Sequence, residues 1–178
     1  MLEQIIGFVA LLAFIVSYQI KSNKALYLTQ TAGVLLFALQ FALLGAWVGC
    51  LSIILTAVRN LLLTKVKDWN WLNHKICPVI ICILFTVILF FTWNGSTSLF
   101  SYAASIISTI AYWTNNAKTI RAANLLICSP CWIIYDVIVG SLGGILSESL
   151  TIVSIIVSIF RFGWKNLGQT ENIKDETK

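Results

Sequence analysis

The sequence predicts an all-α polytopic membrane protein with seven transmembrane helices. Of the 178 residues, 58% are apolar and only 11% are charged, whereas soluble domains carry about 25% charged residues. Successive apolar runs approach 20 residues, the length that crosses a hydrocarbon layer of about 30 Å at 1.5 Å per residue. Because backbone polar groups in lipid must be hydrogen-bonded within their own segment, we expect these runs to be helices.

We expect the seven spans at 2–20, 27–44, 47–64, 76–93, 98–114, 121–139 and 145–163. The first run has neither a basic leading segment nor a small-residue cleavage site, so we interpret it as a span and not as a signal peptide. The turns GAWVG and GSLGG are short and rich in glycine, and KVKDWNWLNHK is the longest internal loop. The polar tail 165–178 is predicted to be disordered and cytoplasmic.

The basic residues determine the expected orientation. With seven spans, all 12 Lys and Arg residues fall on one side, in the loops or span ends after spans 1, 3 and 5 and at the C-terminus. A different number of spans would scatter them over both sides. Basic residues mark the cytoplasmic side, so we expect the N-terminus outside and the C-terminus in the cytoplasm. The same placement accounts for the net charge of +5, and nucleic acid is not an expected partner.

The chain contains an internal repeat. LGAWVG (44–49) resembles VGSLGG (139–144) at an offset of 95, and TAVRN (56–60) resembles SIFRF (158–162) at an offset of 102. We therefore expect one three-helix repeat at 1–64 and another at 98–164, with an inner loop and linker helix at 65–97. A single linker span makes the two repeats parallel, and parallel repeats occur in transporters whose site lies at the repeat interface.

Three segments carry a family resemblance. ILTAVRNLL, ASIISTIAYW and CWIIYDVIVGSLGG, with a later IFRF, resemble the YgjV-type family of bacterial inner-membrane proteins over nearly the whole chain to about Trp164. This resemblance implies a multi-pass protein of the bacterial inner membrane. The 3+1+3 layout in turn resembles the SWEET and PQ-loop superfamily, whose members move sugars or amino acids by alternating access. The Pro-Gln motif of that superfamily is absent, since the corresponding positions read Tyr18-Gln19 and Tyr112-Trp113. Its hinge mechanism is therefore not implied.

Polar residues recur at helical steps on spans 3 and 7, although polar groups are expensive at membrane depth. An offset of 102 superimposes the two polar stripes, so that Arg59 meets Arg161. The expected solute-binding residues are Ser52, Thr56, Asn124, Tyr135, Asp136, Ser154 and Ser158, and the expected gating or charged residues are Arg59, Glu148 and Arg161. The alternative is that small polar residues let helices pack closely and that the arginines reach lipid headgroups.

These observations favour a transporter or facilitator of a small polar solute, working by alternating access between the two repeats. The alternative is a non-transporting membrane scaffold or partner subunit, in which the same polar residues pair with one another. Enzyme activity is not expected, because His74 is the single histidine and no nucleophile–base or HExxH pattern is present. Cys128 and Cys131 lie in an apolar run, so neither a metal nor a cofactor is expected. The expected partners are the lipid bilayer and the unidentified solute, and a second copy of the chain is a further candidate.

Overall fold

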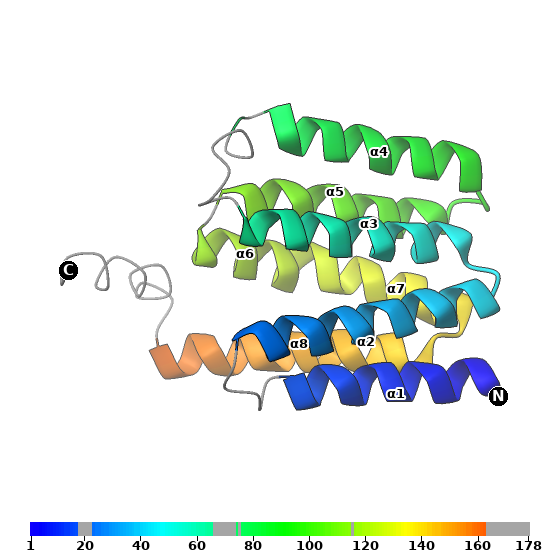
Figure 1. The fold of residues 1–178 in the computed structure, drawn as a ribbon, viewed down its shortest axis with the longest axis horizontal. Coiled ribbons are helices and arrows are strands. Elements are labelled where there is room, and N and C mark those ends of the chain that lie inside the picture. The colour runs from blue at the N-terminus through cyan, green and yellow to red at the C-terminus, as the bar shows by residue number, and fades with distance from the viewer. Residues whose placement is uncertain (18–22, 66–73, 75, 115, 163–178) are drawn as a thin grey trace.

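The computed structural model describes residues 1–17, 23–65, 74, 76–114 and 116–162. Within these ranges the chain is helical and contains no strand. The helices are α1 (Leu2–Ser17), α2 (Asn23–Leu43), α3 (Trp47–Thr64), α4 (Ile76–Thr92), α5 (Ser98–Trp113), α6 (Ala117–Ala123), α7 (Ser129–Val139) and α8 (Leu142–Phe162). A π-helical turn, η2 (Asn124–Cys128), joins α6 to α7, so Ala117–Val139 forms one continuous rod. The rods lie side by side with their axes roughly aligned (Figure 1).

A helix occupies each of the seven expected spans, but the second, sixth and seventh begin earlier than expected. Their expected starts were residues 27, 121 and 145, whereas α2, α6 and α8 begin at Asn23, Ala117 and Leu142. The Asn116 side chain accepts hydrogen bonds from the backbone N–H groups of Lys118 at 2.9 Å and Thr119 at 3.4 Å. This N-cap starts α6 before the apolar run begins. The expected disordered tail 165–178 and most of the loop 65–75 lie outside the described residues.

The turn expected at GSLGG is shorter than its five letters suggest. Gly140 adopts a left-handed conformation with φ of 77°, and the N–H of Ser141 donates to the carbonyl oxygen of Asp136 at 2.8 Å, which ends α7. The Ser141 hydroxyl accepts from the N–H of Gly144 at 3.2 Å, which caps α8. Gly45, with φ of 71°, occupies the equivalent turn between α2 and α3.

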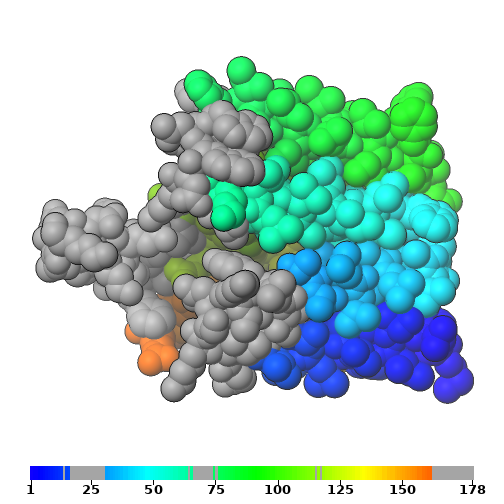
Figure 2. Space-filling model, in the orientation of Figure 1, coloured from blue at the N-terminus to red at the C-terminus, as the bar shows by residue number. Residues whose placement is uncertain are grey.

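Six rods form a closed ring. Each contacts the next in the order α1, α2, α3, α5, the α6–η2–α7 rod and α8, and α8 contacts α1. Helix α4 lies outside the ring against α3 and α5. Figure 2 shows the side chains of α1, α2, α3 and α4 packed against one another on one face. Helices α1, α3, α5 and α8 begin at the end of the ring where the N-terminus lies (Figure 1). We call this end the N-terminal end of the ring.

The outer surface of the ring is apolar. Helix α4 buries Cys77, Ile81 and Phe85 at steps of four, while Phe90 and Phe91 are each 80% exposed. Two described helical stretches are long and apolar enough to cross a membrane, Lys118–Val139 (22 residues) and Leu142–Arg161 (20 residues). Shorter apolar stretches occur in α1, α2, α3 and α4. An apolar exterior around a partly polar interior is the arrangement that a hydrocarbon solvent favours.

The helix starts give the internal repeat a single register. Helices α1 and α5 begin at Leu2 and Ser98, which are 96 positions apart, and α3 and α8 begin at Trp47 and Leu142, which are 95 apart. The rods that begin at Asn23 and Ala117 are 94 apart. The expected offset of 102 concerns residues near the other ends of these two helices and stays a prediction. It rests on a short likeness there, whereas the glycine turns that start both helices lie 95 positions apart.

Candidate functional site

The ring encloses a cavity of about 660 Å³. All six rods contribute to its wall, and α4 contributes no residue. The apolar and aromatic lining residues are Leu11, Ile15, Val34, Phe37, Phe41, Ile53, Trp132, Leu150 and Ile155. The polar lining residues are Thr56, Arg59, Asn60, Ser108, Tyr112, Arg121, Asn124, Ser129, Asp136, Ser147, Glu148, Thr151 and Ser154.

The structure brings six of the ten expected site residues to this cavity. They are Thr56, Asn124, Asp136, Ser154, Arg59 and Glu148. Ser52 and Tyr135 are buried at 2% exposure but are not among the residues that line the cavity. Ser158 and Arg161 also lie outside the lining, and Arg161 is exposed near the end of α8.

Counting from the helix starts gives a second correspondence between α3 and α8, beside the expected pairing of Arg59 with Arg161. In this count Arg59 corresponds to Ser154. Thr56 then corresponds to Thr151, and both line the cavity. The two counts differ by seven residues, about two helical turns. By the count from the helix starts, the cavity wall carries a guanidinium on α3 where α8 presents a small hydroxyl.

Arg59 lies deep in the ring, about 18 Å along α3 from Trp47 at 1.5 Å per residue, and is 2% exposed. Its Nη1 donates to the hydroxyl oxygens of Ser108 at 2.8 Å and Thr109 at 3.1 Å, both on α5. Its guanidinium carbon lies 4.7 Å from the centre of the Tyr112 ring, a cation–π distance. These contacts fix the guanidinium between α3 and α5.

The remaining donors of Arg59 meet a neutral group. Nε and Nη2 donate to Oδ1 of Asn60 at 3.2 Å and 3.0 Å. No carboxylate within the described ranges forms an ion pair with Arg59. A buried charge without an opposite charge is costly in a protein interior and more so in a membrane. Such a residue is a candidate for binding a charged ligand.

Two acidic residues line the cavity nearer its N-terminal end. Asp136 lies about 5 Å from the end of α7 and Glu148 about 9 Å from the start of α8, at 1.5 Å per residue. Asp136 is 2% exposed, and its Oδ1 is buried without a hydrogen-bond partner. Gly144 makes room for it, because a Cβ there would lie 2.5 Å from the Asp136 carboxyl carbon. The cavity thus has acidic side chains toward the N-terminal end of the ring and a guanidinium toward the other end, about 8 Å from the end of α3 at Thr64.

Three aromatic residues pack together toward the N-terminal end of the ring, and two of them, Phe41 and Trp132, line the cavity. The Phe41 ring lies 6.2 Å from Trp132 and 5.7 Å from Tyr135, and the last two lie 5.6 Å apart. The Tyr135 hydroxyl accepts a hydrogen bond from the N–H of Gly49 at 2.9 Å. These three aromatic residues, the aromatic plug, connect α2, α7 and the start of α3.

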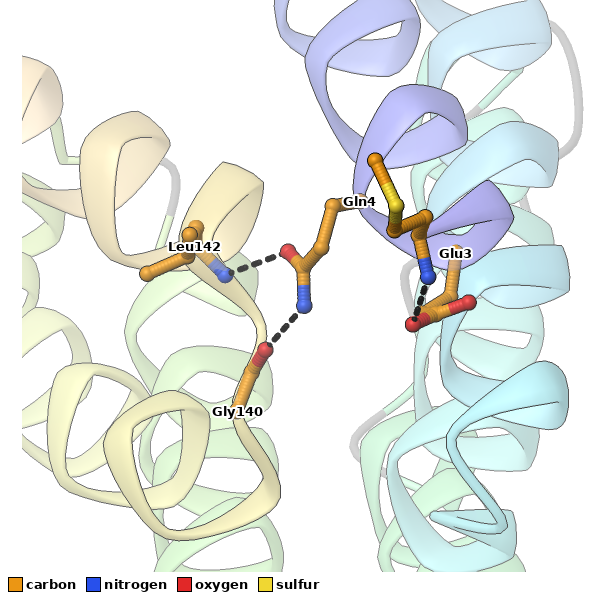
Figure 3. Close-up of polar contacts among 5 residues, drawn as sticks. Glu3, Gln4, Gly140 and Leu142 are labelled. Carbon is orange, nitrogen blue, oxygen red and sulfur yellow. Dashed lines mark hydrogen bonds and ion pairs between the residues drawn. The ribbon is translucent and has the colours of Figure 1, made fainter.

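A glutamine on α1 closes the ring at the same end. Nε2 of Gln4 donates to the carbonyl oxygen of Gly140 at 2.5 Å, and its Oε1 accepts from the N–H of Leu142 at 3.2 Å (Figure 3). Both partners belong to the turn between α7 and α8. One amide side chain therefore holds the first helix against the last turn of the ring.

The α6–η2–α7 rod is locally widened where it lines the cavity. The π-helical turn η2 begins at Asn124 and ends at Cys128, and both residues line the cavity. Pro130 follows and has no N–H to donate to the preceding turn, a known cause of such irregularities. π-Helical turns occur frequently at functional sites. Cys128, expected only to pack, is part of the cavity wall.

Sequence reasoning missed several lining residues, notably Asn60, Ser129, Trp132 and Ser147. Ser147 had a detectable signal, because the turn offset of 95 pairs it with Ser52. The sequence carried no signal for Asn60. Its place next to Arg59 is not a signal, because consecutive residues on a helix point in different directions.

Comparison with known proteins places the chain in a family. The family model for Imp-YgjV, described as a bacterial inner membrane protein, matches residues 1–166. Searches of curated proteins and of solved structures give no significant match. The family match covers the ring, the cavity and α4. The chain therefore belongs to the Imp-YgjV family of bacterial inner membrane proteins.

Proposed function

We propose that the protein is a transporter or facilitator that binds a small polar solute in the six-rod cavity. The cavity volume of about 660 Å³ falls in the range of about 300–1,000 Å³ that is typical of small-ligand sites. The observation that carries the proposal is the buried Arg59 on the cavity wall, whose described neighbours supply no opposite charge. A helix-packing role requires no guanidinium at this depth.

We infer that the ring consists of two parallel repeats, α1–α3 and α5–α8, with α4 as the linker. The contact pattern supports this arrangement, because exchanging the repeats leaves it unchanged. The exchange replaces α1 by α5 and α8 by α3. It therefore turns the contact between α1 and α8 into the contact between α5 and α3, and the structure has both contacts. The implied two-fold axis runs along the rods through the cavity. Parallel repeats around a shared site permit transport by movement of one repeat against the other.

We infer that the cavity is closed at the N-terminal end of the ring. The aromatic plug and the Gln4 contacts lie at this end, whereas Arg121, near the start of α6, lines the opposite part of the cavity. With the orientation expected from the basic residues, the N-terminal end faces outward. We propose that the structure represents a state closed to the outside.

A stability screen tests solute binding. Purified protein in detergent is heated with sugars, amino acids, organic anions and organic cations, because a ligand that binds only the folded state raises the Tm. Ser154→Phe fills the cavity, and Val153→Phe, at a neighbouring residue that is 55% exposed, is the matched control. We expect a stabilising solute whose effect Ser154→Phe abolishes and Val153→Phe retains. A hit that survives Ser154→Phe, or no hit at all, favours the scaffold alternative.

A further inference from the structure

Two sides of the Arg59 guanidinium are held in different ways. Nη1 is fixed by the buried hydroxyl groups of Ser108 and Thr109 on a neighbouring helix. The Nε and Nη2 side instead meets the single Oδ1 atom of Asn60, the next residue on the same helix. Asn60 is exposed and lines the cavity. Its side chain is therefore the replaceable partner of Arg59.

The donors at this side fit a carboxylate better than an amide. Nε–H and Nη2–H are parallel donors, and each can bond one oxygen of a planar carboxylate. Asn60 supplies one neutral oxygen for both. The bonds from Arg59 to Asn60 already have an ionised donor, and an ionised acceptor would add the attraction between opposite charges. A carboxylate at this position would also neutralise the charge that no described residue balances.

We propose that the cavity binds its solute through a carboxylate group, which displaces the Asn60 amide from the Nε and Nη2 side of Arg59. This inference rests on the proposed function and names the chemical class of its solute. Ser108 and Thr109 hold the guanidinium in place while the exchange occurs. Asn60 acts as a stand-in that satisfies the two donors when the cavity holds no solute.

The test measures the Tm of the purified full-length protein with acetate, lactate, glycine and alanine, each beside its primary amide at equal ionic strength. Asn60→Ala empties the displaced position, and Arg59→Gln removes the charge. Asn60→Asp places a permanent carboxylate next to the guanidinium. Asn60→Asp combined with Arg59→Gln shows whether any effect of the new carboxylate requires Arg59.

We expect at least one carboxylate, and not its amide, to raise the Tm of the wild-type protein. Asn60→Ala is expected to keep this shift or enlarge it. Arg59→Gln and Asn60→Asp are expected to weaken binding by about 30-fold or more, as for loss of a buried charge pair. Without ligand, Asn60→Asp is expected to have a higher Tm than wild type, and this gain is expected to vanish in the double variant.

Three outcomes would overturn the inference. The first is that a carboxylate binds the Asn60→Asp variant as tightly as it binds wild type. The second is that an amide raises the Tm of the wild-type protein as much as its carboxylate does. The third is that no carboxylate shifts the Tm. If a neutral solute stabilises wild type and Arg59→Gln equally, and Ser154→Phe abolishes its effect, the carboxylate inference fails while the proposed function stands. If Ser154→Phe changes nothing for any solute, the proposed function fails as well.

Discussion

The Nη1 atom of Arg59 on α3 lies 2.8 Å from the Oγ atom of Ser108 on α5. This contact joins the two proposed repeats on one side of the cavity. On the other side, α1 meets α8 through Gly7 and Gly143, where a Cβ on Gly143 would lie 2.6 Å from the backbone of Gly7. The two junctions are equivalent in topology but differ in chemistry: one is polar and includes a charge, and the other is a close approach of backbones.

The close approach of Gly7 and Gly143 predicts that one added methyl group destabilises the fold. Gly143→Ala places a Cβ against the Gly7 backbone, which is not a flexible side chain and has to move. We expect a loss of about 1–3 kcal/mol in the free energy of unfolding, as for overpacking. The measurement is denaturant unfolding in detergent. Leu146→Ala on the same helix, where the side chain is 44% exposed, is the control, and equal losses in the two variants would refute the close-approach explanation.

The aromatic plug predicts the effect of one hydroxyl group. Gly49 is the third residue of α3, so its N–H has no acceptor within the helix, and the Tyr135 hydroxyl supplies one. Tyr135→Phe leaves that buried donor unsatisfied, and we expect a loss of about 1–3 kcal/mol in the free energy of unfolding. The same unfolding measurement checks it. A variant as stable as wild type would show that the hydroxyl is dispensable.

The Gln4 contacts predict a destabilised ring end. Gln4→Leu removes both hydrogen bonds to the turn between α7 and α8. We expect the free energy of unfolding to fall by about 1–3 kcal/mol, at roughly 0.5–1.5 kcal/mol for each bond. Glu3→Gln is the matched control, because the Glu3 carboxylate pairs with the exposed N-terminal ammonium group, and exposed ion pairs contribute at most about 1 kcal/mol. The prediction fails if the control loses as much stability as Gln4→Leu.

The proposed orientation predicts where the C-terminus lies. A green fluorescent protein fused after Lys178 is expected to fluoresce in bacterial cells, and alkaline phosphatase fused there is expected to be inactive. The reason is that all 12 basic residues lie on the side of the C-terminus when the spans are counted as proposed. Active phosphatase with a dark fluorescent fusion would reverse the orientation.

The positions of the helices could be predicted because apolar runs in a membrane leave few alternatives. The start of the sixth rod could not, because it depends on the Asn116 side chain capping a polar turn that hydropathy excludes. A turn was expected at Gly140 and Ser141. Its length of two residues could not be predicted, because it follows from the hydrogen bonds that end α7 and begin α8.

The site could be predicted only in part. Helical spacing places Thr56 and Arg59 on one face of α3, and they do line the same cavity. The partners of Arg59 depend on which helix lies next to α3, and no residue pattern indicated that this helix is α5. The pairing of Arg59 with Arg161 stays a prediction, because local likeness between two segments does not set the register of whole helices.

Water access to the cavity tests the central claim most directly. Ser154→Cys and Val153→Cys are neighbours on α8, the first lining the cavity and the second 55% exposed on the apolar outside. Each is introduced into a variant without the 5 native cysteines and treated in membrane vesicles with a small, water-soluble, membrane-impermeant thiol reagent that reaches both faces. The account predicts fast labelling of Ser154→Cys and slow labelling of Val153→Cys. Equally slow labelling at both positions would show a dry, packed interior and contradict a solute-binding cavity.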